Sequence, residues 1–395
     1  MPEYKYLIVG GGMAADAASG GIRAVDRDGS IGMIGAEPEP PYNRPPLSKA
    51  LWKGEPEDSI RRMSDDHAVE RRLGRTATSV DPRAKRVVDD RGESYGYDTL
   101  LLATGGTPRR LPFGGDDIIY YRTLEDYRRL RARAGSGTRA AVIGGGFIGS
   151  EIAAALAMNG CSVTMIFPED AIGARVYPRD LAQFLNGYYR EKGVDVLAGC
   201  SVHGYEARDG RAVLLARSGA NERRVEADVV VAGIGITPNI RLAEEAGLRT
   251  GNGIEVDEFL RASDPCIFAA GDVAAFASPA LGRRIRVEHE DNANTMGAHA
   301  GRNMAGQMEP YKHLPFFYSD LFELGYEAVG DLDARLETFA DWKTPFQEGV
   351  VYYLAEGRVA GVLLWNVWGQ VDAARALIEA KETLVPADLA GRLPA

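Results

Sequence analysis

The sequence predicts an α/β protein with two doubly wound, parallel-sheet domains and a smaller α+β domain at the C-terminal end. A pattern of strand, glycine-rich turn and helix occurs near the N-terminus and returns at residues 139–158, and aromatic residues gather in a strand-rich segment from residue 311 onward. A repeated βαβ unit indicates two Rossmann-like dinucleotide-binding domains. The aromatic segment, with a helix expected at residues 371–381, gives the α+β domain.

The first pattern starts with an apolar run at residues 4–9, which is typical of a buried parallel strand. After it come the turn and the first helical residues Gly10, Gly11, Gly12, Met13, Ala14 and Ala15. Gly10 allows a tight turn, Gly12 lets backbone amides approach a pyrophosphate, and Ala15 lets the helix pack closely on the strand. Glu37 follows the next apolar stretch and is placed to accept hydrogen bonds from a ribose. A glycine-rich turn alone is weak evidence for a bound dinucleotide. Here a strand precedes the turn, a helix follows it and Glu37 ends the next apolar stretch, and together these features favour a bound dinucleotide.

The second pattern contains the complete signature Gly144, Gly146 and Gly149, and an acid, Glu169, stands 25 positions after Gly144. An acid at this place favours a free ribose 2′-hydroxyl and therefore NAD over NADP. Arg175 keeps NADP open, because an arginine nearby can receive a 2′-phosphate. Two such units in one chain predict two dinucleotides, each in its own domain.

Composition narrows the class of protein. With 395 residues, 45% hydrophobic residues and 26% charged residues, the chain is expected to be an ordinary soluble protein of two or three domains. A formal net charge of −10 disfavours nucleic acid as a partner. No apolar run reaches the ~18 residues of a membrane span, and no secretory signal is evident, so we expect a cytoplasmic protein. The cysteines Cys161, Cys200 and Cys266 have no CxxC spacing, which argues against a dithiol redox centre.

Several motifs carry a resemblance to a known family. The runs 103–105 (Ala-Thr-Gly) and 270–272 (Ala-Gly-Asp), together with the two dinucleotide motifs, resemble the glutathione-reductase-type flavoproteins. Within these, residues 41–49 are similar to the ferredoxin, rubredoxin and putidaredoxin reductases and to apoptosis-inducing factor. The runs at 143–151, 281–289 and 364–366 resemble apoptosis-inducing factor in particular, although its long acidic insertion is reduced here to residues 341–347.

The resemblance implies two cofactors, FAD and NADH, with NADPH less favoured. For FAD it implies contacts from the first glycine turn, Glu37, Arg44, Lys49, Ala77, Arg109, Asp272, His289 and Trp365. For NADH it implies contacts from Gly145, Gly146, Phe147, Ile148, Glu151, Glu169, Arg175, Gly235 and Glu288. It also implies an FAD domain at residues 1–120 and 250–310, an NAD domain at 121–249 and a C-terminal α+β domain at 311–395.

The catalytic group implied by the resemblance is Lys49, Glu151, His289 and Trp365. Lys49 would sit near flavin N5, paired with Glu151, and a cation there stabilises negative charge as it develops. The alternative for this pair is a purely structural ion pair. His289 and Trp365 would lie against the flavin ring and control access; their alternatives are a satisfied buried imidazole and plain core packing.

Two functions follow from these expectations. The first is an NADH-dependent reductase that passes electrons singly to a [2Fe–2S] ferredoxin or rubredoxin. The second is a redox-gated NADH-binding flavoprotein like apoptosis-inducing factor, with slow oxidase or quinone reductase activity and NADH-linked dimerisation. The resting state, monomer or homodimer, stays open, and a dithiol or persulfide reductase would need Cys161 or Cys200 to be reactive.

Overall fold

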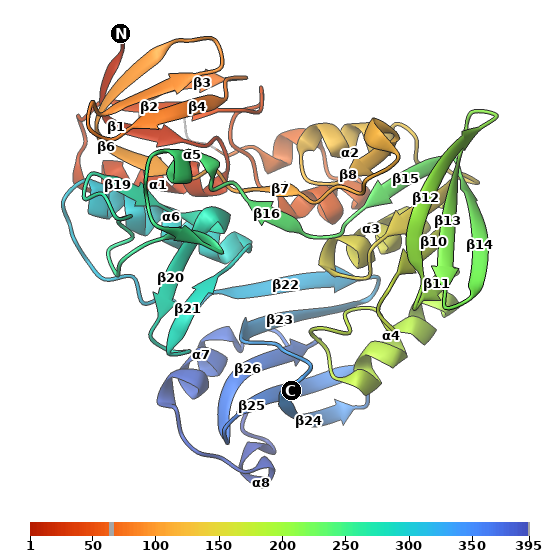
Figure 1. The fold of residues 1–395 in the computed structure, drawn as a ribbon. Coiled ribbons are helices and arrows are strands. Elements are labelled where there is room, and N and C mark those ends of the chain that lie inside the picture. The colour runs from red at the N-terminus through yellow and green to blue at the C-terminus, as the bar shows by residue number, and fades with distance from the viewer. Residues whose placement is uncertain (63–66, 394–395) are drawn as a thin grey trace. The chain divides into compact units, whose positions relative to one another are not determined.

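The computed structural model describes residues 1–62 and 67–393, which divide into two compact units (Figure 1). The first unit contains Met1–Arg44, Glu57–Thr107 and Thr237–Phe317. The second contains Pro45–Pro56, Pro108–Ile236 and Tyr318–Ala395. The C-terminal segment and the segment predicted to bind NADH therefore belong to one compact unit, together with a short excursion around Lys49. The three domain boundaries given above stay a prediction.

The first unit is built on a mixed sheet with the strand order β3-β2-β1-β6-β5-β4, in which β19 also pairs with β6. Its strands are β1 (Glu3–Val9), β2 (Ile31–Gly35), β3 (Val69–Leu73), β4 (Ala77–Asp81), β5 (Arg86–Asp89), β6 (Ser94–Leu102) and β19 (Ile267–Ala269). The central strand β1 runs parallel to both β2 and β6, as the predicted βαβ unit requires. The hairpin β4–β5 extends the sheet in antiparallel fashion.

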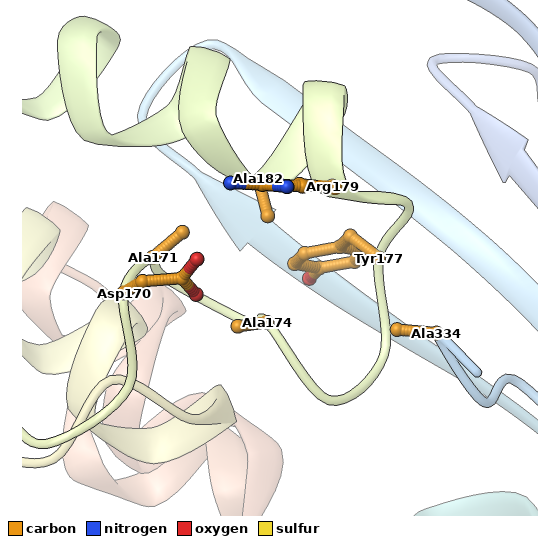
Figure 2. A pocket seen from close by; sticks show the side chains of 7 residues that line it. All are labelled: Asp170, Ala171, Ala174, Tyr177, Arg179, Ala182 and Ala334. Atoms are coloured by element: carbon orange, nitrogen blue, oxygen red, sulfur yellow. The ribbon is translucent and has the colours of Figure 1, made fainter.

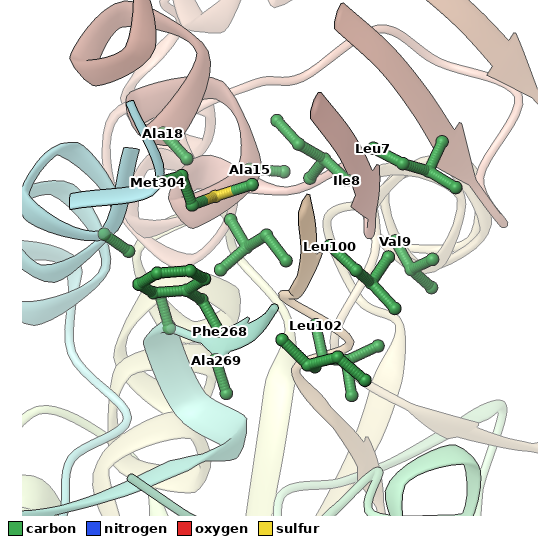
Figure 3. Close-up of a cluster of buried hydrophobic side chains, with 14 of the residues drawn as sticks. Leu7, Ile8, Val9, Ala15, Ala18, Leu100, Leu102, Phe268, Ala269 and Met304 are labelled. Carbon is green, nitrogen blue, oxygen red and sulfur yellow. The ribbon is translucent and has the colours of Figure 1, made fainter. Parts of the chain in front are cut away.

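Two helices of the first unit, α1 (Met13–Val25) and α6 (Glu290–Met304), pack with their backbones close together. A side chain at Gly297 would collide with the backbone of Ala14, and one at Gly301 with that of Ala18. The core of this unit joins side chains of β1, β6 and β19 to the two helices (Figure 3). The smaller elements are η3 (Glu57–Ile60), α5 (Arg241–Glu245), β17 (Thr250–Gly251), β18 (Gly253–Glu255), η6 (Gly271–Val273), β20 (Ala274–Ser278) and β21 (Arg283–Arg286).

The second unit contains an all-parallel sheet with the order β11-β10-β9-β15-β8. Its strands are β8 (Ile118–Tyr120), β9 (Arg139–Ile143), β10 (Ser162–Phe167), β11 (Asp195–Ala198) and β15 (Val229–Ala232). Its helices are η5 (Gly115–Asp117), α2 (Leu124–Arg131), α3 (Phe147–Met158) and α4 (Arg179–Glu191). An antiparallel sheet of β12 (Ser201–Arg208), β13 (Arg211–Ser218) and β14 (Asn221–Ala227) packs on it through an apolar cluster that includes Leu214, Val225 and Val230.

The C-terminal part of the second unit is a sheet with the order β22-β23-β26-β25-β24. Its strands are β22 (Phe316–Leu321), β23 (Leu324–Gly330), β24 (Glu337–Thr344), β25 (Glu348–Ala355) and β26 (Arg358–Trp365), and the helices α7 (Val371–Ala380) and α8 (Pro386–Leu389) follow. The helix α7 packs on β23 and β26. The excursion near the N-terminus adds the short helices η1 (Pro45–Ser48) and η2 (Ala50–Lys53) to this unit.

The chain passes between the units within β7 (Gly106–Pro108) and β16 (Ile236–Pro238), which pair as a two-stranded sheet. The strand expected at residues 4–9 and the helix expected at residues 371–381 form within one residue of those bounds, as β1 and α7. In the repeated pattern, Gly146 is the N-cap of α3, so the helix starts directly at the glycine turn.

Candidate functional site

The glycine turn of the first unit has the shape of a phosphate-binding turn. Gly10 has φ +136°, and a side chain there would collide with the carbonyl of Ala103. Gly12 is the N-cap of α1 and has no side-chain cap, so N–H groups of the first turn of α1 lack a side-chain acceptor. A Cβ at Gly12 would meet only the Arg44 guanidinium, at 3.9 Å. The turn therefore offers a dinucleotide both open space and unpaired donors, and the residues fit the predicted cofactor.

An acid, a phenol and a cation meet beside this turn. The Tyr42 hydroxyl donates to Glu37 Oε2 at 2.5 Å, and the Arg44 guanidinium pairs with the same carboxylate. Burial alone would lower the pKa of Arg44, but its electrostatic interactions with Tyr42, Glu37 and Asp272 raise that pKa above its ordinary value. Sequence reasoning placed Glu37 and Arg44 at this cofactor but missed Tyr42, although Tyr42 stands two residues before Arg44 in the stiff proline-rich loop.

Two further residues predicted to contact FAD, Ala77 and Asp272, also belong to the first unit. Ala77 is buried in β4, and Asp272 lies in η6, where its carbonyl accepts a hydrogen bond from Arg286 Nη1 at 2.9 Å. Arg286 also pairs with Glu288 at 2.6 Å. Glu288, which is predicted to contact NADH, thus belongs to the first unit, unlike the other residues predicted for that cofactor.

His289 has an aromatic partner that the sequence does not reveal. It is the N-cap residue of α6, and its imidazole stacks on Phe317 with the ring centroids 4.2 Å apart and the planes at 10°. Both rings are only partly buried. The pair is a flat, partly accessible aromatic surface, which is compatible with contact to another planar ring.

The glycine turn of the second unit repeats the first. Gly144 has φ +117°, and its Cβ would meet the carbonyl of Gly233. A Cβ at Gly145 would meet the ring of Phe167 at 2.7 Å, and one at Gly149 would collide with the carbonyl of Gly144. Gly146 is the exposed N-cap of α3, so this turn also presents backbone donors at a helix N-terminus. Phe147 and Ile148, the next predicted contacts, form the first turn of α3.

Glu169, the acid predicted to favour NADH, forms an ion pair with Arg175, the arginine that could instead receive the 2′-phosphate of NADPH. Arg175 Nη2 lies 2.6 Å from Glu169 Oε1. The loop that carries Arg175 is tied to the glycine turn, because Gly173 N donates to Gly145 O at 2.8 Å. A cavity of about 400 Å³ opens beside this loop, with Asp170, Tyr177 and Arg179 in its wall (Figure 2).

Two residues predicted for different cofactors are neighbours within the second unit. Arg109 N donates to Gly235 O at 2.9 Å, and the Arg109 side chain passes 3.9 Å from the space where a Cβ of Gly235 would lie. The predicted assignment of Arg109 to FAD and of Gly235 to NADH stays a prediction.

Lys49 and Glu151 form the ion pair that the resemblance implies, and both side chains are largely buried. Lys49 Nζ lies 2.7 Å from Glu151 Oε1, and the two side chains are 11% and 4% exposed. Two serines complete the carboxylate: Ser319 Oγ donates to Oε1 at 2.6 Å and Ser48 Oγ to Oε2 at 2.5 Å. The ring of Tyr318 lies 5.3 Å from the ammonium, within cation–π range. Only Lys49 and Glu151 were identified from the sequence; the serines and Tyr318 were missed.

Trp365 has the surroundings of a core residue. Its side chain is 0% exposed, its indole N–H donates to the carbonyl of Phe346 at 2.9 Å, and its ring stacks on Tyr326. Tyr177 packs edge-on against both rings. This geometry matches the alternative of plain core packing, and the contact of Trp365 with the flavin stays a prediction. An aromatic residue at a strand end gives no sequence signal that separates the two roles.

Other classes of site find little support in the described residues. All three cysteines are free, and burial raises the pKa of Cys161, whose thiol donates to the carbonyl of Gly135. Within residues 1–62 and 67–393, no cluster of metal-ligating side chains occurs. In the same part of the chain, no helix has the length and apolar character needed to cross a membrane.

Comparison with known proteins gives two family matches. Residues 4–300 match the family described as pyridine nucleotide-disulphide oxidoreductase. Residues 300–345 and 340–380 match the family described as apoptosis-inducing factor, mitochondrion-associated, C-term.

Individual proteins resemble the chain over nearly its whole length. It is 36% identical to the anthranilate 1,2-dioxygenase system ferredoxin–NAD(+) reductase component of Burkholderia cepacia, over 99% of this chain and 98% of that protein. It is 33% identical to apoptosis-inducing factor 1, mitochondrial, of Dictyostelium discoideum, over 97% and 79%. The crystal structure of the covalent putidaredoxin reductase–putidaredoxin complex matches with a TM-score of 0.91 and 31% identity, over 98% and 96% of the two chains. The predicted fold class is thereby confirmed.

Proposed function

Because the chain belongs to the pyridine nucleotide-disulphide oxidoreductase family, we propose that it is an NADH-dependent flavoprotein reductase that delivers electrons to a ferredoxin-type iron–sulfur protein. Its cofactors are FAD and NADH. The observation that carries the proposal is the buried pair of Lys49 and Glu151 in a chain whose cysteines form no dithiol. In this proposal the Lys49 ammonium supplies the positive charge beside the flavin, and the electrons leave the flavin without passing through a pair of cysteines.

The residues of the first unit bind FAD in this proposal. The amides after Gly12 receive the pyrophosphate, Glu37 accepts hydrogen bonds from the adenosine ribose, and Arg44 balances the nearby negative charge. Asp272 is assigned to a hydroxyl of the flavin side chain. When bound, FAD accepts a hydride from NADH and returns the electrons singly, which matches a two-electron donor to a one-electron acceptor.

The residues of the second unit bind NADH and supply the charge. The amides after Gly146 receive the pyrophosphate of NADH, and Glu169 accepts from its ribose. Lys49 provides a fixed positive charge beside the flavin while the flavin is being reduced. Glu151 keeps the Lys49 ammonium oriented and offsets the cost of burying its charge. A preorganised cation of this kind stabilises developing negative charge without reorganisation of solvent.

The proposal is tested by anaerobic reduction with NADH followed by mixing with acceptors. We expect a [2Fe–2S] ferredoxin to reoxidise the protein faster than quinone or oxygen does. Uniformly slow reoxidation by all acceptors would contradict the reductase function.

The second candidate, an NADH-gated binding protein, is favoured by the match of residues 300–380 to the C-terminal family of apoptosis-inducing factor. It predicts slow turnover together with a larger apparent mass in size-exclusion chromatography when NADH is present.

Coenzyme choice is the second point that can be tested here. The Glu169 carboxylate would repel a 2′-phosphate, whereas Arg175, which now pairs with it, would attract one. We therefore expect Glu169→Ser to raise the ratio of kcat/KM for NADPH over NADH by about tenfold or more. Glu169→Asp is the matched control, because it keeps the charge and should keep the preference for NADH. An unchanged ratio in Glu169→Ser would show that this acid does not select the coenzyme.

A further inference from the structure

We propose that Ser319, on the C-terminal strand β22, is a positioning residue that holds the Glu151 carboxylate and thereby fixes the Lys49 ammonium. The inference rests on the proposed function, because it assigns to Lys49 the role of a charge beside FAD. It extends that function because a residue of the C-terminal sheet helps to hold Lys49 in position through Glu151.

The geometry around Glu151 leaves its carboxylate fully engaged. Ser319 is 1% exposed, and its hydroxyl donates to Oε1, the same oxygen that Lys49 approaches. Ser48 donates to Oε2. One ammonium and two hydroxyls donate to the Glu151 carboxylate, and charge-assisted hydrogen bonds of this kind hold a side chain in one orientation. The two serines therefore fix the rotation of the carboxylate.

The phenols of Tyr177 and Tyr326 add no further charge near the Lys49–Glu151 ion pair. Burial raises the pKa of Tyr177 and of Tyr326 well above the ordinary phenol value, and the negative charge of Glu151 raises both further. These phenols therefore stay neutral at working pH and add no charge beside Lys49 and Glu151. Without the Ser319 hydroxyl, Oε1 would depend on Lys49 alone, and the ammonium would be drawn toward Glu151 and away from any other acceptor.

Three successive residues of β22 contact the segment that carries Lys49 or its partner. The ring of Tyr318 lies over the Lys49 ammonium, Ser319 bonds Glu151, and Asp320 pairs with Lys53 at 3.1 Å. Consecutive strand residues point to opposite faces, so Tyr318 and Asp320 extend from one face of β22 and Ser319 from the other. Contacts from both faces fix the position of this strand along the segment. The C-terminal sheet thus contacts this segment at three places, and Ser319 is the residue of the three that bonds the partner of Lys49.

The experiment measures anaerobic reduction of the FAD-loaded protein by NADH, with the Kd for NADH separated from the limiting rate. We expect Ser319→Ala to lower the limiting rate about tenfold with little change in Kd, and to make the flavin reduction potential more negative. Ser319→Cys, which is close in volume but a weak donor, should behave like Ser319→Ala, whereas Ser319→Thr should retain the rate. In a Glu151→Gln background, Ser319→Ala should add almost nothing, because the bond it removes is to the carboxylate.

Ser278→Ala is the matched control. Ser278 is also buried, but its hydroxyl accepts from the backbone N–H of Leu281, so its loss should leave both rate and potential unchanged. The inference is overturned if Ser319→Ala equals Ser278→Ala, or if the effects of Ser319→Ala and Glu151→Gln multiply independently. Failure of the wild-type protein to be reduced by NADH would instead overturn the proposed function, so the two failures are distinguishable.

Discussion

Replacing Lys49 with methionine is expected to slow the reduction of bound FAD by NADH by about two orders of magnitude. The substitution keeps the length and the apolar stem of the side chain but removes the positive charge that faces the developing negative charge. FAD content should change little, because the pyrophosphate turn and Glu37 belong to the first unit and do not involve Lys49. Stopped-flow absorbance of the flavin measures the rate directly.

Two further variants separate chemistry from stability. Lys49→Met leaves Glu151 buried without its cation, which is destabilising by about 3–5 kcal/mol when one partner of a buried pair is removed. The double variant Lys49→Met/Glu151→Gln restores neutrality and should recover stability but not the rate. Lys53→Met, on the same short segment, is the matched control, because Lys53 is 51% exposed and pairs with Asp320. An equal loss of rate in Lys53→Met and Lys49→Met would contradict the special role of Lys49.

The two glycine turns are expected to fail separately when a methyl group is added. Gly10→Ala places a Cβ against the carbonyl of Ala103 at a φ of +136°, so we expect colourless protein that does not retain FAD. Gly149→Ala places a Cβ against the carbonyl of Gly144, so we expect yellow protein with a Kd for NADH raised about tenfold. FAD content and fluorescence titration with NADH measure the two effects.

Matched glycines test whether these effects arise at the turns. Gly92 has a φ of +79° with no atom near its Cβ, so Gly92→Ala carries backbone strain without a collision and should retain FAD. Gly187 lies in α4 with open space around it, so Gly187→Ala should bind NADH normally and gain roughly 0.5–1 kcal/mol of stability. Loss of FAD in Gly149→Ala, or its full retention in Gly10→Ala, would contradict the assignment of the turns.

The sequence predicts the parts of this site that are local in the chain. The turns at Gly10 and Gly144 each follow a buried strand and open a helix, so a stretch of about 20 residues contains the whole signal. Glu37 and Glu169 follow the next strand of each unit, and their place is fixed by the same βαβ geometry. Lys49 and Glu151 came from resemblance, because nothing in their spacing predicts that they meet.

The parts that sequence reasoning missed depend on distant pairings. Ser319 is 168 residues from Glu151, and only the packing of β22 in the second unit brings the two together. A lone serine in an aromatic strand carries no pattern of its own. Trp365 shows the opposite limit, since an aromatic side chain in a strand has the same sequence pattern whether it lines a site or fills a core.

The most direct measurement is an anaerobic titration of the purified yellow protein with NADH, in which the absorbance of the flavin is recorded after each addition. We expect one equivalent of NADH to bleach the flavin of the wild-type protein and NADPH to do so far less effectively. The flavin of Lys49→Met should bleach only slowly. Colourless protein that cannot be reconstituted with FAD, or yellow protein that neither coenzyme bleaches, would contradict it.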